Sequence, residues 1–132
     1  MRNKFLFLFS ILIFSLLTIS MSESAKKTYL YIDGNNNDYL INTDSIYYNP
    51  VTKNESSSGE YSGGEPKSDK LTAEEFSKIE SQMKSIVKDK KNQIDNRLMG
   101  CGTLVIGNKS LFIYANSPLK TELENYLKSC LQ

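Results

Sequence analysis

Histidine and tryptophan are absent from this sequence of 132 residues, and cysteine and proline are scarce, with two and three residues. Histidine is the commonest general base and the usual partner of serine and cysteine nucleophiles, so its absence argues against the common hydrolase sites. Two cysteines without histidine are too few for a closed zinc site, which takes four ligands. We therefore expect no metal, no cofactor and no enzymatic activity.

A surplus of charge is also missing, because the chain has 16 basic and 15 acidic side chains. Proteins that bind nucleic acid normally carry a basic surplus, and those held at membrane surfaces by charge carry a cationic cluster. The lysines between 84 and 91 fall where a helix is expected to end, and there they offset the helix dipole. The balance excludes nucleic acid as an expected partner.

One long apolar run, residues 5–20, follows a basic start made by Arg2 and Lys4. It has the length of a signal-peptide core and falls short of the roughly 20 residues that span a bilayer. Small serines follow it, and they predict cleavage after Ser24 or Ser22. The first 24 residues are thus expected to be a signal peptide, with an uncleaved membrane anchor as the alternative.

The predicted mature chain, residues 25–132, is one small domain with a modest core. We expect it to be secreted, or periplasmic if the source is a Gram-negative bacterium, and to have no membrane contact after cleavage. In such compartments thiols tend to oxidise, which favours a disulfide between Cys101 and Cys130. The alternative is two buried or separately reactive thiols, because the expected topology carries the two sulfurs toward opposite ends of the sheet.

Strand patterns occur in two parts of the mature chain. Residues 28–33 and 39–48 are rich in aromatic and branched side chains around a turn-forming GNNND cluster, which predicts a hairpin. Residues 102–106 and 110–114 form a second predicted hairpin, with Gly107 in its turn.

Two helices are predicted from caps and apolar stripes. Thr72 and Glu75 form a capping box, after which apolar residues recur at spacings of three and four and continue to about Leu98. A final helix begins where Ser117 caps and Pro118 takes the first helical position. The order strand, strand, helix, strand, strand, helix predicts an α+β domain: a four-stranded, mainly antiparallel sheet with both helices on one face.

Residues 50–70, rich in serine, glycine and charge, are predicted to form an exposed loop longer than most structureless connections. Tyr61 is the large aromatic side chain within its central stretch, flanked by Glu60 and Glu65, and these three are the candidate binding residues. The alternative for this segment is a solvated linker.

Tyrosine supplies the other candidate surface, since six of the eight tyrosines precede the first predicted helix: Tyr29, Tyr31, Tyr39, Tyr47, Tyr48 and Tyr61. Phenol side chains suit an exposed recognition surface and equally suit a half-buried strand face. Arg97, beside the glycines of RLMGCG, is the one plausible anion contact, although that segment lacks the strand-to-helix context of a phosphate loop.

Two further sets of residues have conditional roles. Asn54 and Asn108 begin glycosylation sequons, which matter only in a eukaryotic secretory pathway. Asp33, Asp38 and Asp44 flank the first hairpin, where turn formation explains aspartate without any acid–base chemistry.

These observations predict a secreted, non-enzymatic module that binds an extracellular protein or glycan through the 50–70 loop or a tyrosine-bearing sheet face. An inhibitor of an extracellular enzyme, or a small carboxylate-dependent hydrolase, is the alternative.

Overall fold

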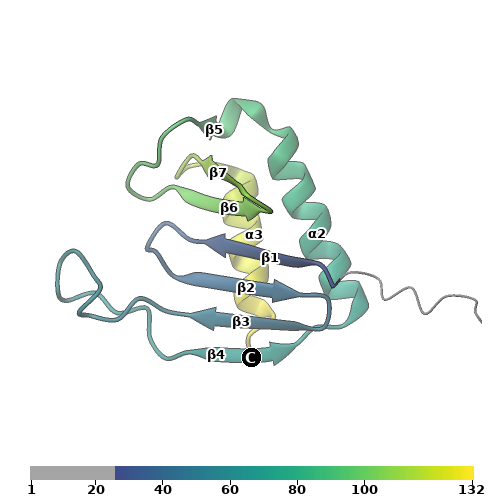
Figure 1. Ribbon diagram of the computed structural model, residues 1–132, viewed down its shortest axis with the longest axis horizontal. Coiled ribbons are helices and arrows are strands. Elements are labelled where there is room, and N and C mark those ends of the chain that lie inside the picture. Colours follow the sequence, from purple (N-terminus) through teal and green to yellow (C-terminus); the bar gives the residue numbers. More distant parts are fainter. Residues whose placement is uncertain (1–25) are drawn as a thin grey trace, which may run out of the picture.

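A computed structural model describes residues 26–132, so the predicted signal peptide lies outside the described residues. Within them the chain forms one antiparallel sheet with two helices packed on one face (Figure 1). The α+β class and the two helices are confirmed. The sheet, however, has seven strands where the sequence patterns predicted four.

Every pair of neighbouring strands in the sheet is antiparallel, and the order across it is β4-β3-β2-β1-β6-β7-β5. The N-terminal strand β1 therefore lies in the interior of the sheet, between β2 and β6. The strands in chain order are β1 (Thr28–Ile32), β2 (Asp38–Asn42), β3 (Ser45–Asn49), β4 (Lys67–Lys70), β5 (Gln93–Ile94), β6 (Gly102–Ile106) and β7 (Lys109–Ile113).

Three differences account for the larger sheet. The predicted strand 39–48 is two strands, because its polar interruption is the turn between β2 and β3. Strand β4 occupies the last residues of the predicted 50–70 loop, where pairing with β3 holds a charged KSDK sequence extended. Strand β5 has only two residues and pairs with β7 in a segment predicted to continue the helix.

Both helices begin where the caps predicted. In α2 (Ala73–Lys88) the Thr72 hydroxyl accepts from the Glu75 amide, and the Glu75 carboxylate accepts from the Thr72 amide. Helix α3 (Pro118–Ser129) has Ser117 as its cap and proline in its first turn. The extension of the first helix to Leu98 was wrong: α2 ends at Lys88, and a short 3-10 turn, η1 (Lys90–Asn92), leads into β5.

The core lies between the sheet and the helices. Alternate strand residues point to the helices and are buried there, as are the apolar stripes of α2 and α3. Its fully buried side chains include Tyr31, Tyr39, Ile41, Ile46, Leu104, Ile113, Ile79, Leu123 and Leu127. The remaining strand residues form the opposite face, which neither α2 nor α3 covers (Figure 1).

The predicted disulfide is absent, and Cys101 and Cys130 are separate buried thiols. Cys101 directly precedes β6, whereas Cys130 follows α3, and the next residue, Leu131, lines a depression with Tyr39 of β2 and Tyr48 of β3. Strand β1 lies between β6 and β2, so the two cysteines are attached to different parts of the sheet. The chain therefore has two buried thiols, which is the alternative that the expected topology favoured.

Candidate functional site

The tyrosines before α2 do not form an open patch. Tyr31 and Tyr39 are buried under the helices, and Tyr29 and Tyr48 pack partly against the same core. Their hydroxyls are engaged as well: Tyr31 Oη donates to Glu124 at 2.8 Å, and Tyr48 Oη donates to the Gly63 carbonyl at 2.8 Å. Of the strand tyrosines, only Tyr47 is on the open face, with 44% of its surface exposed.

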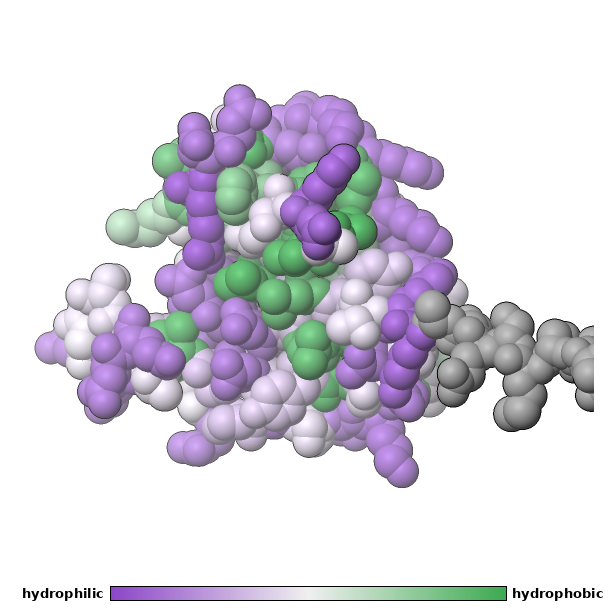
Figure 2. Space-filling model, viewed as in Figure 1, coloured by the Kyte–Doolittle hydropathy of each residue, from purple (hydrophilic) through white to green (hydrophobic). Residues whose placement is uncertain are grey.

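The open face of the sheet is instead mainly aliphatic. The strand register places Tyr47, Leu40, Leu30 and Val105 in one row across four strands. The next row contains Ile32, Thr103 and Phe112, followed by Ile94. We call the six side chains Leu30, Ile32, Leu40, Tyr47, Val105 and Phe112 the open-face patch. Figure 2 shows hydrophobic residues gathered over the middle of this face.

The residues that border the open-face patch are neutral and polar except at two positions, one of which, Asp38, pairs with Ile32. The apolar row of Tyr47 to Val105 ends in Ser68 on one side and Ser110 on the other. Two charged residues occupy strand positions that point to this same face: Asp38, at the start of β2, and Lys70, at the end of β4. Burial raises the pKa of Asp38, with a smaller opposing effect from its hydrogen bond to Asn49. The patch is thus nearly free of charge.

The open-face patch was not predicted, because the tyrosines and the long loop were the candidate surfaces in the sequence. Leu30 and Ile32 alternate with Tyr29 and Tyr31 along β1, so the pattern did show two faces of different chemistry. Nothing local decided which face the helices would cover. Tyr29 and Tyr31 are on the covered face because their rings fill the gap between sheet and helices, and their hydroxyls reach Glu80 and Glu124 there.

The segment after β3 is exposed, but it is braced by hydrogen bonds. Its first turn closes when Thr52 donates to the Glu55 carboxylate through its amide and its hydroxyl, at 3.0 and 2.7 Å. Farther along, the Gly63 amide donates to the Val51 carbonyl at 2.9 Å, which brings the two ends of the loop together. The loop is a defined structure on the surface rather than a bare tether.

Asn37, on the β1–β2 turn, anchors this loop in addition to Tyr48. Its Oδ1 accepts from the Val51 amide at 3.0 Å, and its Nδ2 donates to Tyr61 Oη at 3.1 Å. Asn37 is itself held because Nδ2 also donates to Asp33 Oδ2 at 2.9 Å. The candidate Tyr61 therefore has a fixed hydroxyl and a ring that remains 37% exposed.

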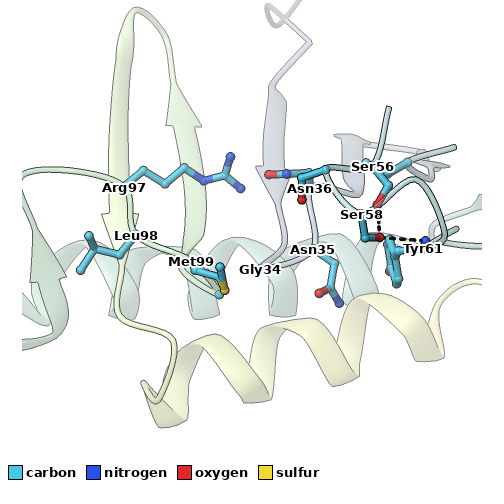
Figure 3. Close-up of a pocket in the computed structure, with 12 residues that line it drawn as sticks. Gly34, Asn35, Asn36, Ser56, Ser58, Tyr61, Arg97, Leu98 and Met99 are labelled. Atoms are coloured by element: carbon cyan, nitrogen blue, oxygen red, sulfur yellow. Dashed lines mark hydrogen bonds between the residues drawn. The ribbon is translucent and has the colours of Figure 1, made fainter. Parts of the chain in front are cut away.

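A hollow of about 510 Å³ opens where three loops meet at one end of the sheet (Figure 3). Its walls are the β1–β2 turn at 34–36, the long loop at 56–58 with Val51 and Tyr61, and the loop 97–100 that precedes β6. Arg97 is the only cationic residue among these lining residues, and none of them is a carboxylate. We call this feature the three-loop hollow.

Glu60 and Glu65, the other candidate binding residues, are exposed and do not line the three-loop hollow. Glu65 lines a separate depression of about 290 Å³ beside Lys67 and Lys128. The sequon asparagines Asn54 and Asn108 are both exposed, in a turn of the long loop and in the β6–β7 turn.

The three aspartates of the first hairpin have structural partners. Both Asp33 carboxylate oxygens accept from its own turn, from the amides of Asn35 and Asn37 and from the Asn37 side chain. Asp44 lies in the β2–β3 turn at the other end of these strands and pairs with Lys26 at 2.9 Å. A site for two cooperating carboxylates is not assembled from Asp33 and Asp44.

One ion pair is buried beneath the sheet. Lys120 Nζ lies 3.1 Å from Glu124 Oε1, with 8% and 15% of the two side chains exposed. Tyr31 donates to the same carboxylate, and burial together with the Glu124 charge raises the pKa of Tyr31. Gly102 lies against this phenol, since a β-carbon there would collide with Tyr31 Oη. These groups are tightly enclosed, so they stabilise the fold and offer no access to a ligand.

Comparison with known proteins gives no assignment: the chain matches no family model, no curated protein and no solved structure. Within residues 26–132 no helix has the length and apolar character needed to cross a membrane. Over that same part of the chain, no three or more acidic, cysteine or histidine side chains gather as a possible metal site. The candidate surfaces are thus the open-face patch and the three-loop hollow.

Proposed function

We propose that the mature protein is a secreted, non-enzymatic binding module that contacts a protein partner through the open-face patch. The observation that carries this proposal is the continuous apolar surface formed by six side chains on the face that α2 and α3 leave uncovered. Leu40 and Tyr47, near its exposed side, have 39% and 44% of their surface in contact with solvent. Contiguous apolar surface of this kind on a small domain is typical of an interaction site.

The chemistry of the patch favours a protein over a glycan. Protein interfaces have charge-depleted, apolar centres with tyrosine among their preferred residues, surrounded by a polar rim. Leu30, Leu40 and Val105 offer no hydrogen bonds to sugar hydroxyls, whereas Ser68 and Ser110 at the ends of the row supply a neutral polar rim.

The edges of the sheet are poor sites for pairing with another strand, which supports a face-on contact. Edge strand β4 carries two lysines and an aspartate in four residues, and edge strand β5 has only two residues. Charged or very short edge strands resist addition of a further strand. A partner would therefore gain more by packing on the face than by extending the sheet.

The test compares capture of partners by wild-type protein and two face variants, Leu40→Lys and Tyr47→Lys, from the native extracellular fluid. Each variant places a charge within the proposed interface at one of its two most exposed side chains, so we expect at least a tenfold loss of the captured partner. Ile106→Lys is the matched control, because Ile106 is 42% exposed but points to the other face of the sheet. Equal capture by all four proteins would contradict the proposal.

Replacement of 55–65 by a short linker separates this proposal from contact through the long loop. Capture should persist if the face is the site, and it should be lost if Tyr61 is the main anchor. Because Tyr61 is bonded to Asn37, the circular dichroism spectrum of the deletion variant must first match that of the wild type.

A further inference from the structure

The three-loop hollow has a rigid floor where two turns touch backbone to backbone. A β-carbon on Gly34 would lie 2.5 Å from the Gly100 carbonyl oxygen, so no side chain fits between these turns. Asn36 and Gly100 both have a positive φ, of 70° and 78°, a conformation that favours asparagine and glycine. The position of this floor therefore does not depend on a ligand.

The walls provide neutral hydrogen-bonding groups and one aromatic ring. The Asn35 and Asn36 side chains line the hollow, and their amides can donate as well as accept. Ser57 and the Tyr61 ring line the hollow as well, and the bond from Asn37 holds the Tyr61 hydroxyl in place. Figure 3 shows Arg97 and Tyr61 on opposite sides of the hollow. Sugar hydroxyls need donors and acceptors together, and sugar rings pack against aromatic faces.

Arg97 brings a single positive charge to this neutral surface. One of its terminal nitrogens donates to the Asp33 carbonyl at 3.3 Å, and no carboxylate within residues 26–132 forms a salt bridge with it. The nearby carboxylates have other hydrogen-bond partners. Asp33 accepts from its own turn, and Glu55 accepts from Thr52. Asp38, whose pKa burial raises and the Arg97 charge lowers slightly, is hydrogen-bonded to Asn49. The guanidinium keeps donors free for a ligand, and its fork matches a carboxylate.

We infer that the three-loop hollow binds an acidic saccharide, with the sugar carboxylate on Arg97 and the ring between Asn36 and Tyr61. The volume of about 510 Å³ lies within the range of small-ligand sites, which is about 300–1,000 Å³. One guanidinium matches the single charge of a uronic or sialic acid. A phosphate monoester carries nearly two charges and would be only half compensated.

The test is a titration of isotope-labelled protein, expressed from its full-length precursor, followed by amide chemical shifts. The probes are methyl glucuronide, neutral methyl glucoside, acetate and a glutamate-rich peptide. Saturating shifts at Asn35, Asn36, Ser57 and Gly100 are expected with methyl glucuronide, at an affinity at least tenfold above that for methyl glucoside. Acetate, which has the charge without the ring, should bind more weakly than the glucuronide.

Arg97→Gln should lower affinity for the glucuronide at least tenfold and abolish the preference over the glucoside, while Arg97→Lys should restore part of it. Lys109→Gln is the control, because it removes an exposed charge from the β6–β7 hairpin, away from the lining residues. Equal affinity for the two sugars, an unchanged Arg97→Gln variant, or shifts with the peptide alone would each overturn the inference. Since the readout does not use the open-face patch, its outcome is independent of partner capture.

Discussion

The buried pair of Lys120 and Glu124 gives the sharpest test of the energetics of this fold. Glu124→Gln preserves the shape of the side chain and an acceptor for the Tyr31 hydroxyl, but it leaves the Lys120 ammonium without a counter-charge. Removing one member of a buried ion pair costs about 3–5 kcal/mol. Because 15% of the Glu124 side chain reaches solvent, we expect the lower end, about 3 kcal/mol. For a domain of this size that lowers Tm by roughly 12 °C.

A double-mutant cycle separates the charge effect from packing. Lys120→Met alone should cost about 2 kcal/mol, because Glu124 keeps its bond from Tyr31 and partial access to water. The variant with both substitutions has no unpaired charge. It should also lose only about 2 kcal/mol, well short of the sum of the single changes, which gives a coupling energy of about 3 kcal/mol.

The assay is urea unfolding followed by far-ultraviolet circular dichroism. Lys84→Met provides the matched control: Lys84 also pairs with a glutamate four residues away, but 65% of its side chain is exposed. That surface pair should contribute no more than about 0.5 kcal/mol. If the double variant were as unstable as the sum of the two single variants, the proposed role of the buried pair would be refuted.

Three further predictions address other parts of the molecule. Hydrogen bonds from Lys27 and other neighbours lower the pKa of Glu80 from 4.5 to about 2, so its stabilisation is complete above pH 4.5 and is lost as the pH falls toward 2. Glu80→Gln should flatten the Tm-against-pH curve in that range, and an unchanged slope would count against the network. Gly34→Ala should lower the free energy of unfolding by about 1–3 kcal/mol in urea, because its β-carbon meets the Gly100 carbonyl; wild-type stability would contradict that close approach. Unfolded, non-reduced protein should present two thiols to a colorimetric reagent, whereas a disulfide between Cys101 and Cys130 would leave none.

Features governed by local chemistry were predictable from the sequence. The Thr72 capping box and the Ser117 cap involve residues within one helical turn, and the Gly107 turn needs only its flanking strands. Strand β4 was missed because its KSDK sequence has no intrinsic preference for extended structure, and only pairing with β3 holds it. The same applies to the two residues of β5, which compete with an apolar pattern typical of a helix.

The candidate surfaces were predicted less well than the elements. Tyr61 does line a hollow, and Arg97, considered from its glycine neighbours alone, lies in the same hollow. Their proximity joins a loop after β3 to a loop before β6, and no local pattern reports such a meeting. For the same reason, the sequence could not tell that Leu40 and Tyr47, rather than Tyr31 and Tyr39, would reach solvent.

The interior position of β1 has a consequence for the order of folding. Strands β1 to β4 follow one another along the chain and pair as successive hairpins, so half of the sheet can form from local contacts. The other half joins it through one strand pair, β1 with β6, in which Leu30, Tyr31 and Ile32 are opposite Val105, Leu104 and Thr103. Pairing β1 with β6 closes a chain loop that contains most of the domain, and contacts between residues so far apart in sequence slow folding. Pairing of β1 with β6 is therefore the expected rate-limiting step of folding. A chain still missing its C-terminal third would expose one edge of β1.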